Sequence, residues 1–133
     1  MPSALGTKYL STEWAEQLTK ALDADERAKP YATDQDTLFQ MNVEGGPDGD
    51  RSYFVHVNNG SIVIAIDSPR GEPDITGTLS YEHASQLLKG ELDGTAAMMT
   101  GKLKVEGEMA RVLKAANALN LVPEAASTID IDY

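Results

Sequence analysis

The chain of 133 residues contains no cysteine, only one tryptophan and two phenylalanines, and few basic residues. Without cysteine there can be no disulfide bond, no thiolate metal site and no cysteine nucleophile. The 11 lysines and arginines are outnumbered by 21 aspartates and glutamates, so the formal net charge is −10. Nucleic acids and anionic lipid surfaces both attract clustered positive charge. The composition therefore argues against an anionic membrane surface and excludes nucleic acid as an expected partner.

Long apolar runs are also absent from the sequence. The longest is Ile62–Ile66, whereas a membrane-spanning helix needs about 20 apolar residues. Residues 1–8 contain no apolar core of signal-peptide length, and the final residues, Ile131 to Tyr133, are not a peroxisomal address. Together with the lack of cysteine, these absences predict a cytoplasmic protein without an integral membrane span.

The residues that are present form a globular composition, with 41% hydrophobic and 24% charged side chains. The chain length fits one domain. A helix is predicted from about residue 12 to residue 28, because Ser11 is a suitable N-cap and the following apolar residues recur at helical spacing. Pro30 is expected to end this helix.

Four strands are predicted after this helix. The runs on either side of Asn59-Gly60 form a β-hairpin, because this dipeptide is typical of a two-residue hairpin turn. Ile62–Ile66 is continuously apolar, so its strand is expected to be covered on both faces, or on one face by protein and on the other by a ligand. The other strands show alternating apolar and polar side chains. The four expected strands are 37–43, 52–58, 61–67 and about 74–80.

Three helices and a fifth strand complete the pattern. Ser80 can cap a helix that starts at Tyr81, and Gly90 suits the left-handed position after its end. A final helix opens at Gly107 and is expected to stop at Pro123. Between them we expect a short helix at 92–100 and a strand at 102–106. The sequence thus predicts one α+β domain over residues 1–133, with an N-terminal helix at about 12–28, a core at 37–118 and an unassigned C-terminal tail at 119–133.

No residue pattern indicates catalysis or metal binding. His56 and His83 are the only histidines, and no residues at metal-ligand spacing surround them. The carboxylates are scattered over predicted helices and loops, without a pair suited to hydrolysis. We therefore expect no catalytic residue, no metal and no cofactor. The side chains of Met98, Met99 and Met109 are flexible and suit either an irregular core or an adaptable cavity, and the pattern alone leaves both interpretations open.

Three consecutive segments resemble the middle of the sterol carrier protein-2 family. They are Asp74–Glu82, Leu87–Asp93 and Ala97–Glu108. The most specific parts are the Lys89-Gly90 helix end and the Gly-Lys-Leu-Lys-Val-Glu-Gly run at 101–107. The likeness extends over about residues 37–118, and the order of the predicted elements agrees with that of the family.

This resemblance implies a five-stranded, mostly antiparallel sheet covered by helices, with an apolar tunnel between the two layers. Family members bind fatty acids, fatty acyl-CoA thioesters, sterols or similar lipids without converting them, and the chain is short enough to be such a domain alone. Both a monomer and a homodimer are compatible with the resemblance. The positions implied to contact the lipid are Ala84, Leu87, Leu88, Met98, Met99, Leu103, Val105, Val112, Leu113 and Ala116.

Two other functions remain open at this point. A structural or oligomerisation module would have a filled core, so that a tryptophan at Met99 would overpack and destabilise it. In a lipid tunnel the same change would block the ligand at little cost in stability. A small enzyme acting on a hydrophobic substrate would need polar groups inside the pocket, and His56, Tyr53 and Tyr81 are the candidates.

Overall fold

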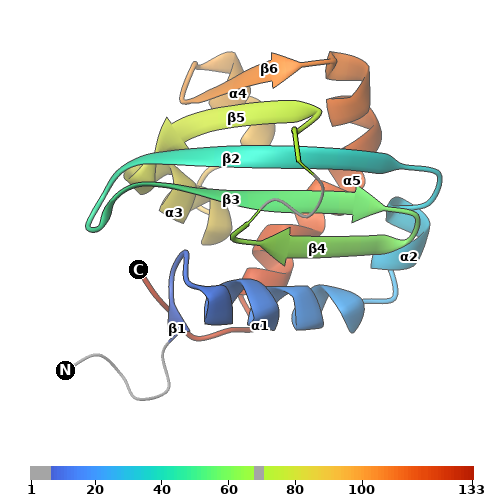
Figure 1. The fold of residues 1–133 in the computed structure, drawn as a ribbon, viewed down its shortest axis with the longest axis horizontal. Coiled ribbons are helices and arrows are strands. Elements are labelled where there is room, and N and C mark those ends of the chain that lie inside the picture. Colours follow the sequence, from blue (N-terminus) through green and yellow to red (C-terminus); the bar gives the residue numbers. More distant parts are fainter. Residues whose placement is uncertain (1–6, 68–70) are drawn as a thin grey trace.

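A mixed five-stranded sheet forms the centre of the protein in the computed structural model, which describes residues 7–67 and 71–133. The strands lie in the order β4-β3-β2-β5-β6 (Figure 1). Strands β2 and β5 pair in parallel, and all other neighbours in this sheet are antiparallel. The predicted α+β class and the mostly antiparallel sheet are confirmed. The strands are β2 (Asp36–Gly46), β3 (Gly49–Asn58), β4 (Ser61–Ala65), β5 (Ile75–Ser80) and β6 (Leu103–Gly107).

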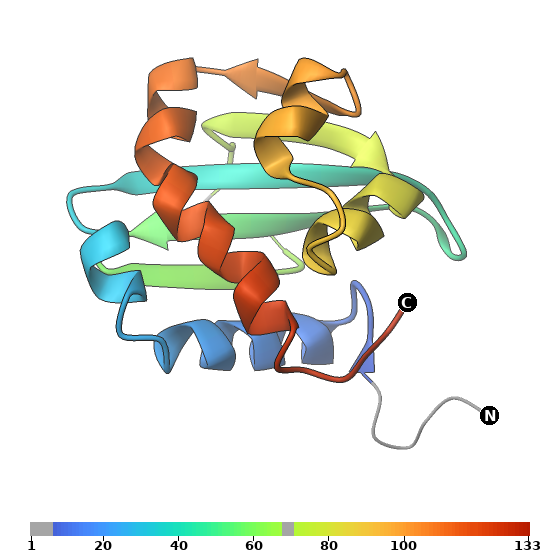
Figure 2. The same ribbon diagram turned by 180° about the vertical axis from the view of Figure 1, so that it is seen from behind.

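The helices lie on one face of this sheet and along one of its edges. Figure 2 shows α3, α4 and α5 in front of the strands, with α1 below them. Helix α1 packs along the edge strand β4 and against α5, and the backbone N–H of Ile64 donates to Thr19 Oγ1 of α1 at 2.9 Å. The helices are α1 (Thr12–Asp23), α2 (Ala28–Tyr31), α3 (Tyr81–Leu88), α4 (Gly94–Met99) and α5 (Met109–Ala126).

Side-chain caps fix where three of these helices begin. Ser11 Oγ accepts from the backbone N–H of Trp14, and Ser80 Oγ accepts from that of His83, each at 3.1 Å. Asp93 Oδ2 caps α4 in the same way. Each cap satisfies one of the N–H groups that a helix start leaves without an internal partner. The predicted caps at Ser11 and Ser80 are confirmed.

Two prolines do not end helices where the sequence pattern placed the ends. The first helix stops at Asp23, before Pro30, which instead lies within α2. Pro30 is the third residue of that helix, where its missing N–H would have no internal partner in any case. Pro123 lies inside α5, which continues to Ala126. Its last turn is held by burial of apolar residues, which outweighs the lost hydrogen bond.

The C-terminal tail, which the sequence left unassigned, pairs with the start of the described chain. Strand β1 (Thr7–Lys8) and strand β7 (Ile131–Asp132) form a parallel two-stranded sheet. The N–H of Thr7 donates to the carbonyl of Asp130 at 2.8 Å. This pairing places Thr7–Lys8 and Ile131–Asp132 side by side next to α1 (Figure 1).

The two faces of the central sheet differ in cover. Phe39, Met41 and Val43 point toward the helices, as do their partners on β3 and β5. The opposite face is more polar and carries His56, whose Nε2 lies 2.8 Å from Asp36 Oδ1. Val63 of β4 lies on this face and is 36% exposed. The first alternative for this apolar strand, cover on both faces, is therefore wrong, because helices of the described chain cover only one face. The second, protein on one face and a ligand on the other, stays a prediction.

Candidate functional site

Beneath α1 the helix–sheet interface is occupied by large, fully buried side chains. Trp14, Leu18 and Leu22 of α1 are fully buried. They share one face of the helix because they are spaced four residues apart, and they join a core with Val57 and Ile62 of the sheet. These three side chains line neither of the two cavities described below, so this half is packed as a core.

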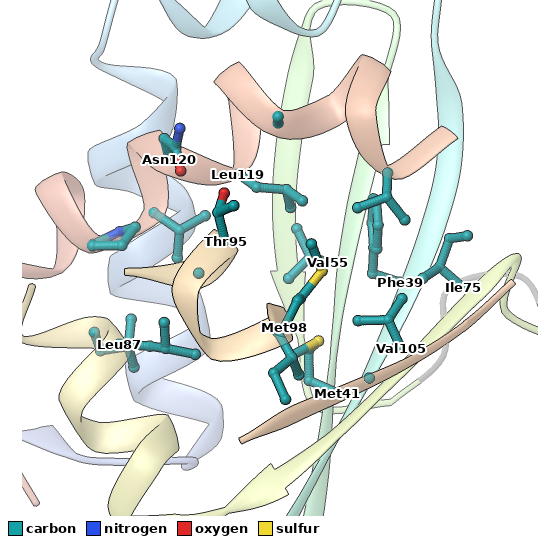
Figure 3. A pocket seen from close by; sticks show the side chains of 18 of the residues that line it. Phe39, Met41, Val55, Ile75, Leu87, Thr95, Met98, Val105, Leu119 and Asn120 are labelled. Carbon is teal, nitrogen blue, oxygen red and sulfur yellow. The ribbon is translucent and has the colours of Figure 1, made fainter. Parts of the chain in front are cut away.

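Beneath α4 and α5 the same interface contains an apolar cavity of about 200 Å³. Its floor is the inner face of β2, β3, β5 and β6, and its walls are the C-terminal end of α3, α4 and the inner side of α5 (Figure 3). Among the described residues that line it, none is charged. This cavity is the candidate functional site.

One row of paired residues forms the centre of the cavity floor. Tyr53, Met41, Gly77 and Val105 are paired across four adjacent strands in one row. Gly77 has no side chain, and a Cβ there would lie 3.0 Å from Met41 Sδ and 3.2 Å from Leu103 Cδ1. The helix above this row, α4, has only six residues. The side chains of Met41 and Leu103 therefore close over Gly77. The interface is left incompletely filled because the helix that covers this row is short.

Eight of the ten positions predicted to contact a lipid line the cavity. They come from the C-terminal end of α3, from α4, from β6 and from α5, as the resemblance implied. Whether they contact a ligand stays a prediction. The eight are Leu87, Leu88, Met98, Leu103, Val105, Val112, Leu113 and Ala116.

The other two predicted positions do not line the cavity. Met99 is 84% exposed, because Met98 and Met99 are consecutive residues of one short helix and point about 100° apart. Only Met98 faces the sheet (Figure 3). Ala84 is buried in the core, one turn before the cavity-lining Leu87 and Leu88 on α3. Both placements are corrected by the structure.

Twelve lining residues were missed by the sequence analysis. The alternation in the first strands already indicated inward-facing side chains, but not which of them border open space. The α5 residues that follow Ala118 were missed because the resemblance extends only to about residue 118. The twelve are Phe39, Met41, Tyr53, Val55, Ile75, Gly77, Gly94, Thr95, Leu119, Asn120, Val122 and Pro123.

Tyrosines border the cavity where it meets the filled core. Tyr53 lines the cavity, and its ring lies 5.2 Å from that of Trp14 in an edge-to-face contact. The ring of Tyr9 lies 5.1 Å from Trp14 on the other side. Burial raises the pKa of both Tyr9 and Tyr53 far above the usual value. Their hydroxyls are therefore neutral near pH 7 and are not candidates for a general base.

The enzyme candidates do not come together. Tyr53 borders the apolar cavity, but His56 lies on the opposite face of the sheet, next to Asp36. Tyr81 lies outside the apolar cavity and lines a different one. Among the described residues there is no group of three or more histidines or carboxylates that could hold a metal ion. The arrangement brings together no nucleophile, base and orienting group of the kind that covalent catalysis requires.

A second cavity of about 520 Å³ lies near the paired chain ends. It is lined by Tyr9, Tyr81 and Tyr133, and by charged residues that include Arg51 and the ion pair between Lys8 and Asp48. Its volume is larger, but its lining mixes both signs of charge with aromatic rings. It lacks the continuous apolar surface of the cavity under α4 and α5.

None of the helices in the described ranges is both long and apolar enough to cross a bilayer.

Comparison with known proteins gives one consistent result. The model of the SCP-2 sterol transfer family matches residues 14–120. A fatty acid-binding protein of Yarrowia lipolytica is 38% identical over 93 residues, which are 69% of this chain and 70% of that protein. Sterol carrier protein 2 of Gallus gallus is 31% identical over 90 residues, which are 67% of this chain but only 16% of that protein.

The fold is similar to those of solved structures as well. A structure from Thermus thermophilus, described as possibly a sterol carrier protein, superposes with a TM-score of 0.78. It shares 17% sequence identity, and the match covers 97% of this chain and 94% of that one. The predicted fold and the predicted family resemblance are both confirmed.

Proposed function

This chain belongs to the SCP-2 sterol transfer family, and on that premise we propose that it binds a lipid in the apolar cavity and carries it without converting it. The ligand class is a fatty acid, a fatty acyl-CoA, a sterol or a similar molecule with a long apolar part. The observation that carries this proposal is the cavity between the sheet and helices α4 and α5, whose described lining residues are all uncharged. The printed names of the Yarrowia and Gallus relatives, a fatty acid-binding and a sterol carrier protein, support the same class.

Removal of apolar surface from water supplies the binding energy. Each methylene group that a lipid buries contributes about 0.8 kcal/mol, so a chain of about twelve carbons binds without a charged anchor. The cavity of about 200 Å³ is smaller than the range of roughly 300–1,000 Å³ typical of ligand pockets. We expect it to widen when filled, through new rotamers of Met41 and Met98, because methionine side chains are flexible.

The lining favours carriage over conversion. Tyr53 is the one titratable side chain among the described lining residues, and burial raises its pKa. General acid–base catalysis needs a group whose pKa lies near the working pH, and Tyr53 is moved away from that range. A bound lipid would therefore meet surface to pack against but no group placed to react with it.

The organisation of the protein follows from the same proposal. We infer that residues 1–133 act as one lipid-binding domain whose core spans about residues 37–118, either as a monomer or as a homodimer. The absence of cysteine fits a reducing compartment such as the cytoplasm. Sedimentation velocity of the full chain would determine its state of assembly, with and without added lipid.

The proposal is tested on the full-length chain after purification. Native mass spectrometry followed by lipid extraction should reveal a co-purified lipid, and the protein should release a bound fluorescent fatty acid when unlabelled lipid is added. A protein that carries no lipid and shows no displaceable binding of the probe would disprove the proposed function. A product that accumulates from the added lipid would instead indicate an enzyme.

A further inference from the structure

Two uncharged polar side chains stand at the open rim of the apolar cavity. Thr95 belongs to the first turn of α4, and Asn120 belongs to α5. Both line the cavity and both are exposed to solvent, and Figure 3 shows them on the two helices that border it. We call Thr95 and Asn120 the rim pair. A lipid whose apolar chain lies over Met41 and Gly77 would have its polar end at this rim.

The charges near the rim are unfavourable for an anion. Asp93 lies two residues before Thr95, where its Oδ2 accepts from the N–H of Ala96 at 3.0 Å. Lys114 of α5 and Lys89, which follows α3, both make contacts elsewhere. Lys114 Nζ donates to the carbonyl of Asp34 at 2.6 Å, and Lys89 Nζ lies over the ring of Tyr133. An anionic head group at the rim would thus lie near the carboxylate of Asp93 and would be repelled by it.

We propose that the rim pair is the head-group site of the cavity and selects a lipid with an uncharged oxygen-bearing end, such as an alcohol or an ester, over a carboxylate. The threonine hydroxyl and the asparagine amide can each donate and accept a hydrogen bond, which matches a hydroxyl or ester oxygen. This inference rests on the proposed lipid-binding function and adds to it the class of polar end and the residues that select it.

The experiment measures competition of dodecanol and of dodecanoate, at pH 8, against a fluorescent fatty acid bound to the full chain. Asn120→Asp keeps the size of the side chain but adds a negative charge at the rim, and Asn120→Lys adds a positive one. Because the rim is exposed, we expect each change to alter dodecanoate affinity about fivefold, downward for Asp and upward for Lys. Dodecanol affinity should change less than about twofold, since the alcohol carries no charge.

Asn117 provides the matched control for this test. It lies one turn earlier on α5, is exposed, and does not line the cavity. Asn117→Asp and Asn117→Lys change the net charge equally, so they should leave both affinities nearly unchanged. Thr95→Val removes the hydroxyl of the rim pair and should weaken dodecanol binding about threefold. Thermal unfolding of each variant verifies that it is folded.

Three results would overturn the inference, and they are distinguishable. If neither compound displaces the probe, the proposed function itself fails, and the inference fails with it. If both bind but the Asn120 variants behave like the Asn117 variants, lipid binding stands and the rim is not the head-group site. If Arg51→Gln weakens dodecanoate binding, the head group lies in the second cavity, which Arg51 lines.

Discussion

The two halves of the helix–sheet interface share one sheet but differ in how completely side chains fill the space between the sheet and the helices. Under α1, Trp14, Leu18 and Leu22 are fully buried and fill the space above β3 and β4. Under α4 and α5, Leu103 and Val105 are only partly buried, and Leu113 is 68% exposed although it lines the cavity. The comparison teaches that alternation of apolar residues builds both halves, whereas the size of the covering residues decides which half becomes a core and which a pocket.

Helix length strengthens this difference. Helix α1 has 12 residues and presents large side chains at intervals of four, so that each turn adds one to the core. Helix α4 has six residues, and three of the first four are glycine or alanine. Only Met98 extends from it over the floor of the cavity (Figure 3). A short helix with small residues covers the sheet without filling the space above it.

The largest effect of a substitution on the free energy of unfolding is expected under α1. Leu18→Ala should lower the free energy of unfolding by about 2–5 kcal/mol, because it removes a fully buried side chain and leaves a cavity. Urea denaturation of the wild-type protein and the variant measures the difference. A loss below about 1 kcal/mol would mean that this half is also loosely packed, and the contrast between the halves would disappear.

The next effect is expected at high pH, from the tyrosines between the halves. Burial raises the pKa of Tyr9 and Tyr53, and that of Tyr133 to about 12. In the unfolded chain tyrosine ionises near pH 10. The free energy of unfolding is therefore unaffected by ionisation of these tyrosines below pH 10. Above pH 10 it falls by about 1.4 kcal/mol per pH unit for each tyrosine that stays neutral in the folded protein, because the unfolded chain ionises first.

Urea denaturation at pH 8, 10 and 11 measures how steeply the free energy of unfolding falls with pH. Tyr53→Phe should make this fall less steep. Tyr9→Phe should reduce it as well, and at little cost at pH 8, because the Tyr9 hydroxyl has no hydrogen-bond partner among the described residues. The exposed Tyr31 supplies the control through Tyr31→Phe. If neither Tyr9→Phe nor Tyr53→Phe reduces this dependence of the free energy of unfolding on pH, the loss of stability at high pH does not come from these buried rings.

A third effect is expected on binding in the open half. Gly77→Val places two methyl groups on the cavity floor, where they displace about two methylenes of ligand, so affinity should fall about tenfold. The groups that a Cβ would meet are side-chain ends of Met41 and Leu103, which can move. Stability should therefore change by less than about 1.5 kcal/mol.

Probe displacement and urea denaturation measure these two quantities for Gly77→Val. Thr76→Val lies on the same strand but points to the opposite face of the sheet, so it should not alter ligand affinity. A large loss of stability together with unchanged binding would favour the alternative of a structural module with a filled core. A tryptophan at Met99 cannot make this distinction, because Met99 points into solvent.

The smallest effect is expected at the rim of the open half. Leu113→Ala should change the free energy of unfolding by less than about 0.5 kcal/mol, since most of this side chain is already in water. The same substitution at Leu18 should cost several times more, and the pair makes a matched comparison of the halves. A loss above about 2 kcal/mol would mean that Leu113 is packed in solution as in a core.

Much of the fold could be predicted because it depends on local patterns. Ser11 and Ser80 cap the helices that they were expected to cap, and Asn59-Gly60 forms the turn between β3 and β4 with positive φ at both residues. The missed features depend on contacts between distant segments. Pro123 stays inside α5 because the helix end is buried, and the tail forms β7 only because β1 lies beside it.

The candidate site shows the same division. The sequence by itself determined an α+β fold with inward-facing apolar residues on the strands that alternate, since period-two alternation is a property of the chain alone. Only the tertiary structure decided that Met98 faces the sheet and Met99 the solvent, and that Gly77 lies beneath α4. The reason is that a cavity is space that no residue fills. Its existence depends on how large the side chains of several separate elements are where they meet.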